Sequence, residues 1–234
     1  MKNSKTFYCI ICLISVIILI WSLSGNKFVE EFNNDKIIFS LTSLPWRHKH
    51  LVKNLENIRN NIPYAEIHLN LPKIVKRTND KWDLDKIPEH IKNDKNIKIF
   101  LIDDIGPISK LLPTLKRISN PNTLIITIDD DIIYDIDFLK KFIDFLKKYS
   151  NNVLSAKITA IFDINLKEFK NLNKINKKNK FFYVIEGFRG IIYPRHLITD
   201  EIVNQLEKLS KLDKCFRSDD LIISYVLYKN NIKT

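Results

Sequence analysis

Three short acidic runs hold the side chains of this 234-residue sequence that are best suited to chemistry: Asp103-Asp104, Asp129-Asp130-Asp131 and Asp219-Asp220. Adjacent carboxylates repel one another, so a fold that keeps them together normally supplies a cation or hydrogen-bond donors aimed at them. A divalent metal is the leading candidate, because Mg²⁺ and Mn²⁺ prefer oxygen ligands and can bridge two phosphate oxygens of a leaving group. The alternative is a solvated turn, since Asp is also a frequent turn and cap residue.

The apolar run before the central aspartates indicates where they lie in the fold. Residues 123–128 form a short β-branched run, which is typical of a buried strand that delivers Asp129 and its two neighbours to the carboxyl edge of a sheet. Ligands of open α/β sheets bind at that edge. Asp103-Asp104 follows another predicted strand and could share the same cleft, whereas Asp219-Asp220 reaches it only if the last helix begins beneath it.

Apolar periodicity predicts alternating strands and helices over residues 36–234, which we expect to form one domain. The alternation indicates an α/β fold with a Rossmann-like, mixed but mainly parallel sheet flanked by helices. Asp137 is a candidate cap for one of the helices. The predicted strands lie at 36–42, 65–71 and 96–102, from 123 onward, at 153–161 and as two short strands within 181–194; the predicted helices lie at 48–60, 108–118, 138–149, 197–209 and 218–228.

The amino-terminal segment has the length and polarity of a membrane anchor. No charged residue occurs between Lys5 and Lys27, and residues 7–23 are almost entirely apolar. As a helix, the uncharged segment reaches about 30 Å, the thickness of the hydrocarbon core. The positive charge before it predicts a single-pass type II membrane protein, with 1–25 as cytoplasmic tip and transmembrane helix, 26–35 as a stem, and the domain on the lumenal or extracytoplasmic side. A cleaved signal peptide is the alternative, although its apolar core is usually only about 7–15 residues long.

The composition narrows the class of partner. Lys and Arg number 38 against 27 Asp and Glu, a formal charge of +11. The lysines are scattered among Asn and Ile residues and form no helix face interleaved with aromatic residues, so we expect no nucleic-acid binding. Four glycines in the whole chain exclude the glycine-rich loops that bind dinucleotides or nucleoside triphosphates. Three cysteines, two of them within the apolar segment, cannot form a disulfide framework.

Single side chains near the acidic runs have both functional and structural interpretations. Asp220 could remove a proton from an acceptor hydroxyl, but Ser218 could also cap the last helix, with the acidic pair favouring the positive helix end. Lys110 and Arg47 could supply positive charge near the aspartates. His196 could be a further metal ligand, although a surface or core histidine is the commoner case.

Six segments stand in a consistent order that carries a family resemblance: SLTSLPWR (Ser40–Arg47), LNLPKIVKR (Leu69–Arg77), GPISKLLPTL (Gly106–Leu115), TLIITIDDDIIY (Thr123–Tyr134), GFRGIIYP (Gly187–Pro194) and SDDLIIS (Ser218–Ser224). They resemble compact glycosyltransferases of the GT-A fold, in the family 2-like group, over nearly all of the chain after the anchor. Such enzymes carry a D-x-D signature at the end of a buried strand, use Mn²⁺ or Mg²⁺ and bind a nucleotide-sugar donor. The resemblance implies a GT-A-like catalytic domain over residues 36–234.

The resemblance also implies roles for the residues around the D-x-D positions. Asp129 and Asp131 occupy its outer positions, where family members contact the donor ribose and coordinate the metal, and Asp130 would assist. The turn that ends at Arg47 matches the part that holds the nucleotide base, and Lys110 matches a region close to the donor. The expected metal ligands are Asp129 and Asp131, and the expected donor-binding residues are Thr42, Arg47, Asp103, Lys110, Asp129 and Asp130.

Two further segments are implied to act on the sugar and the acceptor. The turn with Gly187, Arg189 and Gly190 corresponds to the part of the fold near the donor sugar and the acceptor. The S-D-D segment resembles the acidic motif that supplies the general base of inverting members. This resemblance implies Asp220 as the catalytic base, with Asp219 as the reserve candidate.

The expected function is a metal-dependent glycosyltransferase that moves a sugar from a nucleotide-diphosphate donor to a hydroxyl of a glycan, protein or lipid. Two departures from the family pattern concern acceptor recognition: the bulky Phe188-Arg189 pair inside the glycine turn, and Ile222 where an aromatic residue is expected. Two alternatives stay open. One is an inactive, membrane-anchored GT-A-like binding protein, and the other is a metal-dependent phosphotransfer or hydrolytic enzyme built on the same aspartates.

Overall fold

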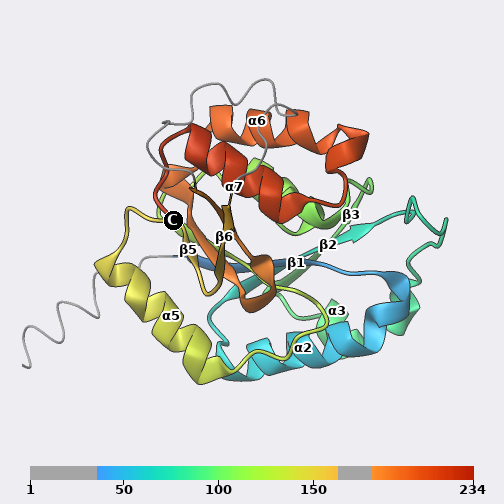
Figure 1. Ribbon diagram of the computed structural model, residues 1–234. Helices are drawn as coiled ribbons and strands as arrows, with labels where there is room; N and C mark the ends of the chain where they lie inside the picture. The colour runs from blue at the N-terminus through green and yellow to red at the C-terminus, as the bar shows by residue number, and fades with distance from the viewer. Residues whose placement is uncertain (1–35, 163–180) are drawn as a thin grey trace, which may run out of the picture. The chain divides into compact units, whose positions relative to one another are not determined.

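A six-stranded mixed sheet forms the centre of this computed structural model, which describes residues 36–162 and 181–234 (Figure 1). In spatial order the strands are β3 (Ile97–Ile102), β2 (Glu66–Pro72), β1 (Lys36–Thr42), β4 (Thr123–Thr127), β8 (Ile191–Pro194) and β5 (Leu154–Ser155). The first four run parallel, and β8 runs antiparallel to both of its neighbours. The prediction of a mixed, mainly parallel sheet is therefore confirmed.

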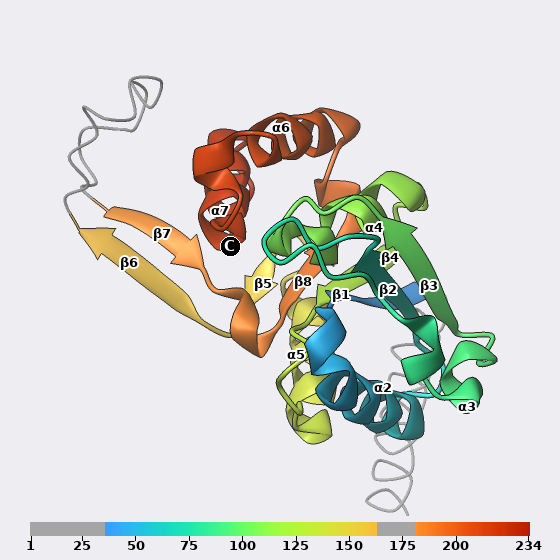
Figure 2. The same cartoon turned by 90° about the vertical axis from the view of Figure 1, so that its right-hand side faces the viewer.

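Helices cover both faces of this sheet (Figures 1 and 2). One face carries α2 (His48–Asn61), α3 (Glu89–Lys92) and α5 (Ile136–Lys148), and the other carries α4 (Leu112–Arg117), α6 (Asp200–Ser210) and α7 (Asp219–Lys229). The amphipathic helices turn their apolar sides inward, and α2, for example, buries Leu51, Leu55 and Ile58. The fold is thus the helix-flanked α/β arrangement that the alternating pattern predicts.

The predicted strand at 153–161 is divided between two sheets. Its first part, β5, joins the main sheet, while β6 (Ile158–Phe162) pairs antiparallel with β7 (Phe181–Ile185) in a ribbon that projects from the main sheet (Figure 2). The hydroxyl of Ser155 donates a hydrogen bond to the carbonyl oxygen of Lys157 (2.7 Å), which holds a bend between the two strands. A local side-chain hydrogen bond of this kind cannot be predicted from the apolar periodicity, so the bend was not expected.

Several helix starts differ from the sequence prediction, including that of α6, which begins at Asp200 and not at 197; two of the differences have a local cause. The helix expected at 108–118 is a 3-10 turn, η3 (Pro107–Lys110), followed by α4, because Pro113 lacks a backbone N–H and is best tolerated in the first turn of a helix. Asp135, and not Asp137, caps α5. Its carboxylate accepts a hydrogen bond from the backbone N–H of Asp137 at 2.9 Å, so the prediction of Asp137 as the cap is wrong.

The amino-terminal predictions fall outside this description. The predicted anchor at 7–23 and the predicted stem at 26–35 both lie outside the described residues. Within 36–162 and 181–234, no helix combines the length and the hydropathy that crossing a membrane requires.

Candidate active site

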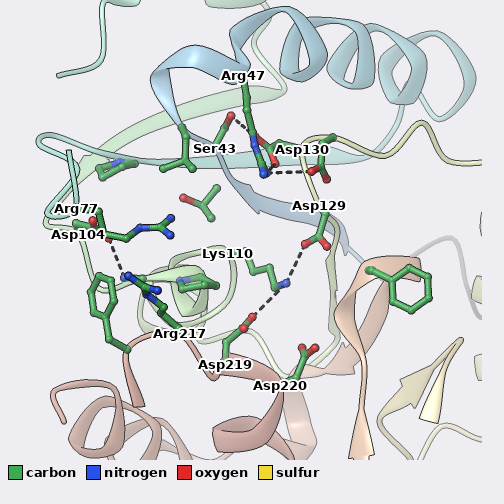
Figure 3. Close-up of a pocket in the computed structure, with 18 residues that line it drawn as sticks. Ser43, Arg47, Arg77, Asp104, Lys110, Asp129, Asp130, Arg217, Asp219 and Asp220 are labelled. Atoms are coloured by element: carbon green, nitrogen blue, oxygen red, sulfur yellow. Dashed lines mark hydrogen bonds and ion pairs between the residues drawn. The ribbon is translucent and has the colours of Figure 1, made fainter. Parts of the chain in front are cut away.

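A cleft of about 480 Å³ lies at the edge of the sheet where the parallel strands end (Figure 3). It is lined by turns that follow β1, β3 and β4, by the start of α7 and by the helical turn η5 (Gly187–Arg189). Parallel strands end at a common edge, so their following turns gather side chains that are distant in the sequence. The three acidic runs meet here through Asp104, Asp129, Asp130, Asp131, Asp219 and Asp220.

The three aspartates after β4 have different surroundings. Asp129 pairs with the Lys110 ammonium at 2.9 Å. Asp130 is buried and accepts hydrogen bonds from the Ser43 hydroxyl (2.5 Å) and the Arg47 guanidinium (3.0 Å). Burial raises the pKa of the Asp130 carboxyl, although Ser43 and Arg47 act in the opposite direction. Asp131 is 43% exposed and also pairs with Arg47, at 3.1 Å, so Arg47 holds two of the three carboxylates.

Lys110 joins the aspartates after β4 to the start of α7 (Figure 3). Its ammonium is buried and lies 2.9 Å from Asp129 and 3.2 Å from Asp219. Burial by itself would lower the pKa of the Lys110 amine, but the charges of Asp219 and Asp129 outweigh burial and raise it. Lys110 is therefore a fixed positive charge at the floor of the cleft.

Asp220 has the properties of a general base. Its Oδ1 accepts a hydrogen bond from the backbone N–H of Gly187 at 3.2 Å. Burial and the neighbouring charge of Asp219 raise the pKa of the Asp220 carboxyl to about 6, against the opposing effect of Lys110. A carboxylate with a pKa near the working pH is well suited to proton transfer. The structural alternative is weaker, because Ser218 stands at the cap position of α7 but its side chain makes no capping hydrogen bond.

Gly187 lies against both charged groups and leaves no space for a side chain. A Cβ atom at this position would lie 2.9 Å from Lys110 Nζ and 3.1 Å from Asp220 Oδ1. Gly190 has a different requirement, because its φ of +92° lies in a region that side-chain-bearing residues rarely adopt. The glycine turn therefore places the backbone, and no side chain, beside Lys110 and Asp220.

Replacing Gly187 with alanine should lower the rate of the sugar transfer expected from the sequence by about tenfold or more, because displacing Lys110 and Asp220 by a fraction of an ångström would disturb groups that such a reaction requires to be aligned. The matched variant is Gly190→Ala, whose methyl group would meet nothing closer than Thr127 O at 3.6 Å. That variant should mainly cost stability, about 1 kcal/mol for the positive φ. Rates and urea unfolding measured on both variants test this difference. An unchanged rate in Gly187→Ala would contradict it.

Most of the predicted site residues line the cleft, namely Thr42, Arg47, Lys110, Asp129, Asp130, Asp131, Asp219 and Asp220. Asp103 does not, since its side chain is 89% exposed and pairs with Lys73 at 3.6 Å. Its neighbour Asp104 takes the place in the cleft wall. Arg189 is exposed beside the Phe188 ring and does not line the cleft, whereas Phe188 does. The exposed His196 does not line it either.

Several residues with a place in the site were not predicted from the sequence. Tyr134 is one: its hydroxyl accepts a hydrogen bond from the backbone N–H of Asp129 (2.9 Å) and donates one to the carbonyl oxygen of Phe188 (3.1 Å). Burial raises the pKa of this hydroxyl, so it stays protonated. The sequence feature that could have indicated Tyr134 is its position at the end of the segment Thr123–Tyr134, five residues after Asp129. The other residues that prediction missed are Ser43, Arg77, Phe216 and Arg217.

Asp129 and Asp131 are the residues that could hold a divalent metal. Among residues 36–162 and 181–234 there is no cluster of three or more His, Cys, Asp or Glu side chains arranged to ligate an ion. Asp129 pairs through Oδ1 and Asp131 through Oδ2, and their other carboxylate oxygens make no hydrogen bond or ion pair with the described residues. Mg²⁺ is commonly held by one or two carboxylates, with water and substrate phosphates completing the set. The pair therefore fits an ion that shares its coordination with a diphosphate.

No protein-family model matches the sequence, and no curated protein matches it significantly. Among solved structures, it is similar to residues 1–349 of S. aureus TarS, a GT-A-type glycosyltransferase, with a TM-score of 0.51 and 14% identity over 83% of this chain and 56% of that one. It is also similar to the 4-diphosphocytidyl-2C-methyl-D-erythritol synthase of Anaerococcus prevotii DSM 20548, with a TM-score of 0.52 and 17% identity over 86% of both chains. These similarities show that the chain has the mixed, mainly parallel, helix-flanked sheet of GT-A-type structures.

Proposed function

We propose that the cleft transfers a sugar from a nucleotide-diphosphate donor to a hydroxyl group of an acceptor, with the help of a divalent metal. The observation that carries this proposal is the meeting, in one cleft, of three kinds of group that the reaction needs. Asp129 and Asp131 offer oxygen ligands, Lys110 offers a buried positive charge, and Asp220 offers a base.

The charge of the cleft supports a role for the metal. Its lining contains six aspartates and four cationic side chains, a formal charge of −2. A nucleotide diphosphate is itself an anion, so such a lining would repel it unless a cation accompanied it. A divalent ion at Asp129 and Asp131 would bring the lining to neutrality.

Each residue then has a separate task. When bound, the ion supplies electrostatic stabilisation of the departing diphosphate. Lys110 adds a fixed positive charge beside Asp129, and Arg47 orients Asp130 and Asp131. Asp220, at the start of α7, takes the proton of the attacking hydroxyl as the new glycosidic bond forms and the bond to the departing diphosphate breaks.

A variant without the Asp131 carboxylate should bind the donor more weakly in the presence of Mn²⁺. We expect a nucleotide sugar with Mn²⁺ to raise the melting temperature of the wild type, since a ligand at 100 times its Kd stabilises by about 2.7 kcal/mol. Asp131→Asn should lose most of the Mn²⁺-dependent part of this shift. Asp103→Asn is the matched control, because it removes the same charge outside the cleft. Equal shifts in wild type and Asp131→Asn would overturn the metal assignment.

A second candidate function is transfer of a nucleotidyl group, and the similarity to the synthase supports it, because that enzyme shares the fold. The products separate the two reactions. Sugar transfer releases a nucleoside diphosphate, whereas nucleotidyl transfer from a nucleoside triphosphate releases pyrophosphate. Incubation with a sugar donor and, separately, with a nucleoside triphosphate and a sugar phosphate would distinguish them. A melting-temperature shift with consumption of neither substrate would instead indicate a binding protein without turnover.

The membrane location is a separate proposal that rests on the sequence alone. Residues 7–23 would anchor a single-pass type II protein, with the catalytic domain on the lumenal or extracytoplasmic side. Protease protection in sealed membranes tests it. Digestion of the domain from the cytoplasmic side would contradict the orientation.

A further inference from the structure

A second cavity, of about 400 Å³, opens beside the candidate active site. It is lined by Lys76, Arg77, Asp213, Phe216 and Arg217, and three of these residues also line the larger cleft, so the two spaces are continuous. Three cationic side chains face one carboxylate there. Figure 3 shows Arg77 and Arg217 together on one side of the cleft, with Asp129 and Asp220 on the other. The combined space is therefore divided into an acidic and a basic part.

The backbone that carries the basic part is firmly held. The Asp104 carboxylate accepts hydrogen bonds from the backbone N–H groups of Lys76 (2.9 Å) and Gly106 (2.8 Å). Gly106 packs so closely on the loop before α7 that a Cβ atom would lie 2.1 Å from the Phe216 carbonyl oxygen. The Lys76 ammonium lies 5.2 Å from the centre of the Phe216 ring, within cation–π range. These contacts join the loop after β2 to the loop before α7 and so fix the spacing of the backbone segments that carry the two arginines.

Within residues 36–162 and 181–234, neither of the two guanidinium groups has a partner. Arg77 and Arg217 are exposed and form no hydrogen bond or ion pair with any other described residue. The two other cations of the cleft are both neutralised: Arg47 pairs with two aspartates after β4, and Lys110 pairs with Asp129 and Asp219. A planar guanidinium presents a fork of donors that matches a carboxylate or a phosphate. Two such forks at one fixed place form a site for an anion.

We propose that Arg77 and Arg217, with Lys76, bind an anionic group of the acceptor, so that the acceptor is a phosphorylated or carboxylated sugar rather than a neutral one. This inference rests on the proposed function. The position favours the acceptor, because Arg217 stands in the loop that leads directly to the base Asp220. The donor diphosphate has its own partners on the opposite side, at Lys110 and the carboxylate pair.

The direct test needs neither a donor nor turnover. Glucose 6-phosphate and glucose are titrated calorimetrically into the full chain. We expect the wild type to bind the phosphorylated sugar at least about tenfold more tightly than glucose, since a charge-assisted bidentate contact distinguishes them. Arg77→Gln/Arg217→Gln should abolish this preference. The control Lys49→Gln/Lys53→Gln removes the same charge from exposed positions of α2 that line neither cavity, and it should keep the preference.

Several outcomes would overturn the proposal. The proposal fails if the wild type binds glucose 6-phosphate no more tightly than glucose, or if the wild type and the double arginine variant bind glucose 6-phosphate equally. The donor provides the second measurement, through the melting-temperature shift with nucleotide sugar and Mn²⁺. If the arginine variant loses that shift in parallel with sugar phosphate binding, the arginines serve the donor. Failure of the proposed function is a different result, because the donor would then remain unconsumed while sugar phosphate binding persists.

Discussion

Replacing Asp220 with asparagine should lower the rate of sugar transfer by about 10²- to 10⁴-fold, the usual contribution of a positioned general base. Asparagine keeps an oxygen that can accept the hydrogen bond from the Gly187 N–H, so the fold and donor binding should be preserved. The loss should therefore fall on kcat, with little change in the donor-induced melting-temperature shift. Transfer kinetics at saturating donor measure the effect.

The pH profile gives an independent check of the same role. Asp220 acts as a base only when it is deprotonated, and burial beside Asp219 raises its pKa to about 6. The wild-type rate should thus fall as the pH drops below about 6. The residual rate of Asp220→Asn should not show this decrease. Asp219→Asn provides the comparison, because it alters the adjacent carboxylate that pairs with Lys110. A full rate in Asp220→Asn would place the base elsewhere.

Replacing Lys110 with methionine should lower the free energy of unfolding by about 3–5 kcal/mol, the usual result of removing one partner from a buried ion pair. The Lys110 side chain is 9% exposed and its ammonium lies between Asp129 and Asp219, whose largely shielded carboxylates would be left without a counter-charge. The rate should fall as well, since the positive charge beside the diphosphate is lost. Urea unfolding and transfer assays measure the two effects.

Two comparisons separate this effect from loss of any lysine. Lys116→Met removes a cation that is 44% exposed and pairs with Glu207 at 2.6 Å, and it should change stability little, because exposed ion pairs contribute little. Adding Asp219→Asn to Lys110→Met should restore part of the loss, since it removes one of the two stranded charges. An equal effect of Lys110→Met and Lys116→Met would mean that the buried pairing is unimportant.

The parts of the site that follow buried strands could be predicted from the sequence. The run at 123–128 is apolar and β-branched, and its residues Thr123–Thr127 form β4, all of them buried. Because the edge at which a parallel strand ends is set by its direction, the position of Asp129–Asp131 followed directly. The acidic pair at the start of α7 was also recognisable as a candidate, and the structure adds the backbone N–H that its second member binds.

The remaining parts depend on contacts between segments far apart in the sequence. Nothing local distinguishes Asp103 from Asp104, and only the backbone N–H groups of Lys76 and Gly106 decide which carboxylate turns inward. Arg77 and Arg217 are 140 positions apart and are two among 38 Lys and Arg residues. Their proximity results from the packing of one loop on another, which periodicity does not record.

The reversed direction of β8 explains how the glycine turn reaches the cleft. Thr127, the last residue of β4, pairs with Ile191, the first residue of β8. The start of β8 therefore lies at the same edge as the ends of the parallel strands, and the turn before it, with Gly187 and Gly190, arrives there from the β6–β7 ribbon. At the base of this ribbon, its two strands are joined by the pairing of Ile158, the first residue of β6, with Ile185, the last residue of β7. The position of the glycine turn at the cleft therefore depends on the base of the ribbon and on β8, so the length of the ribbon can change without moving Gly187.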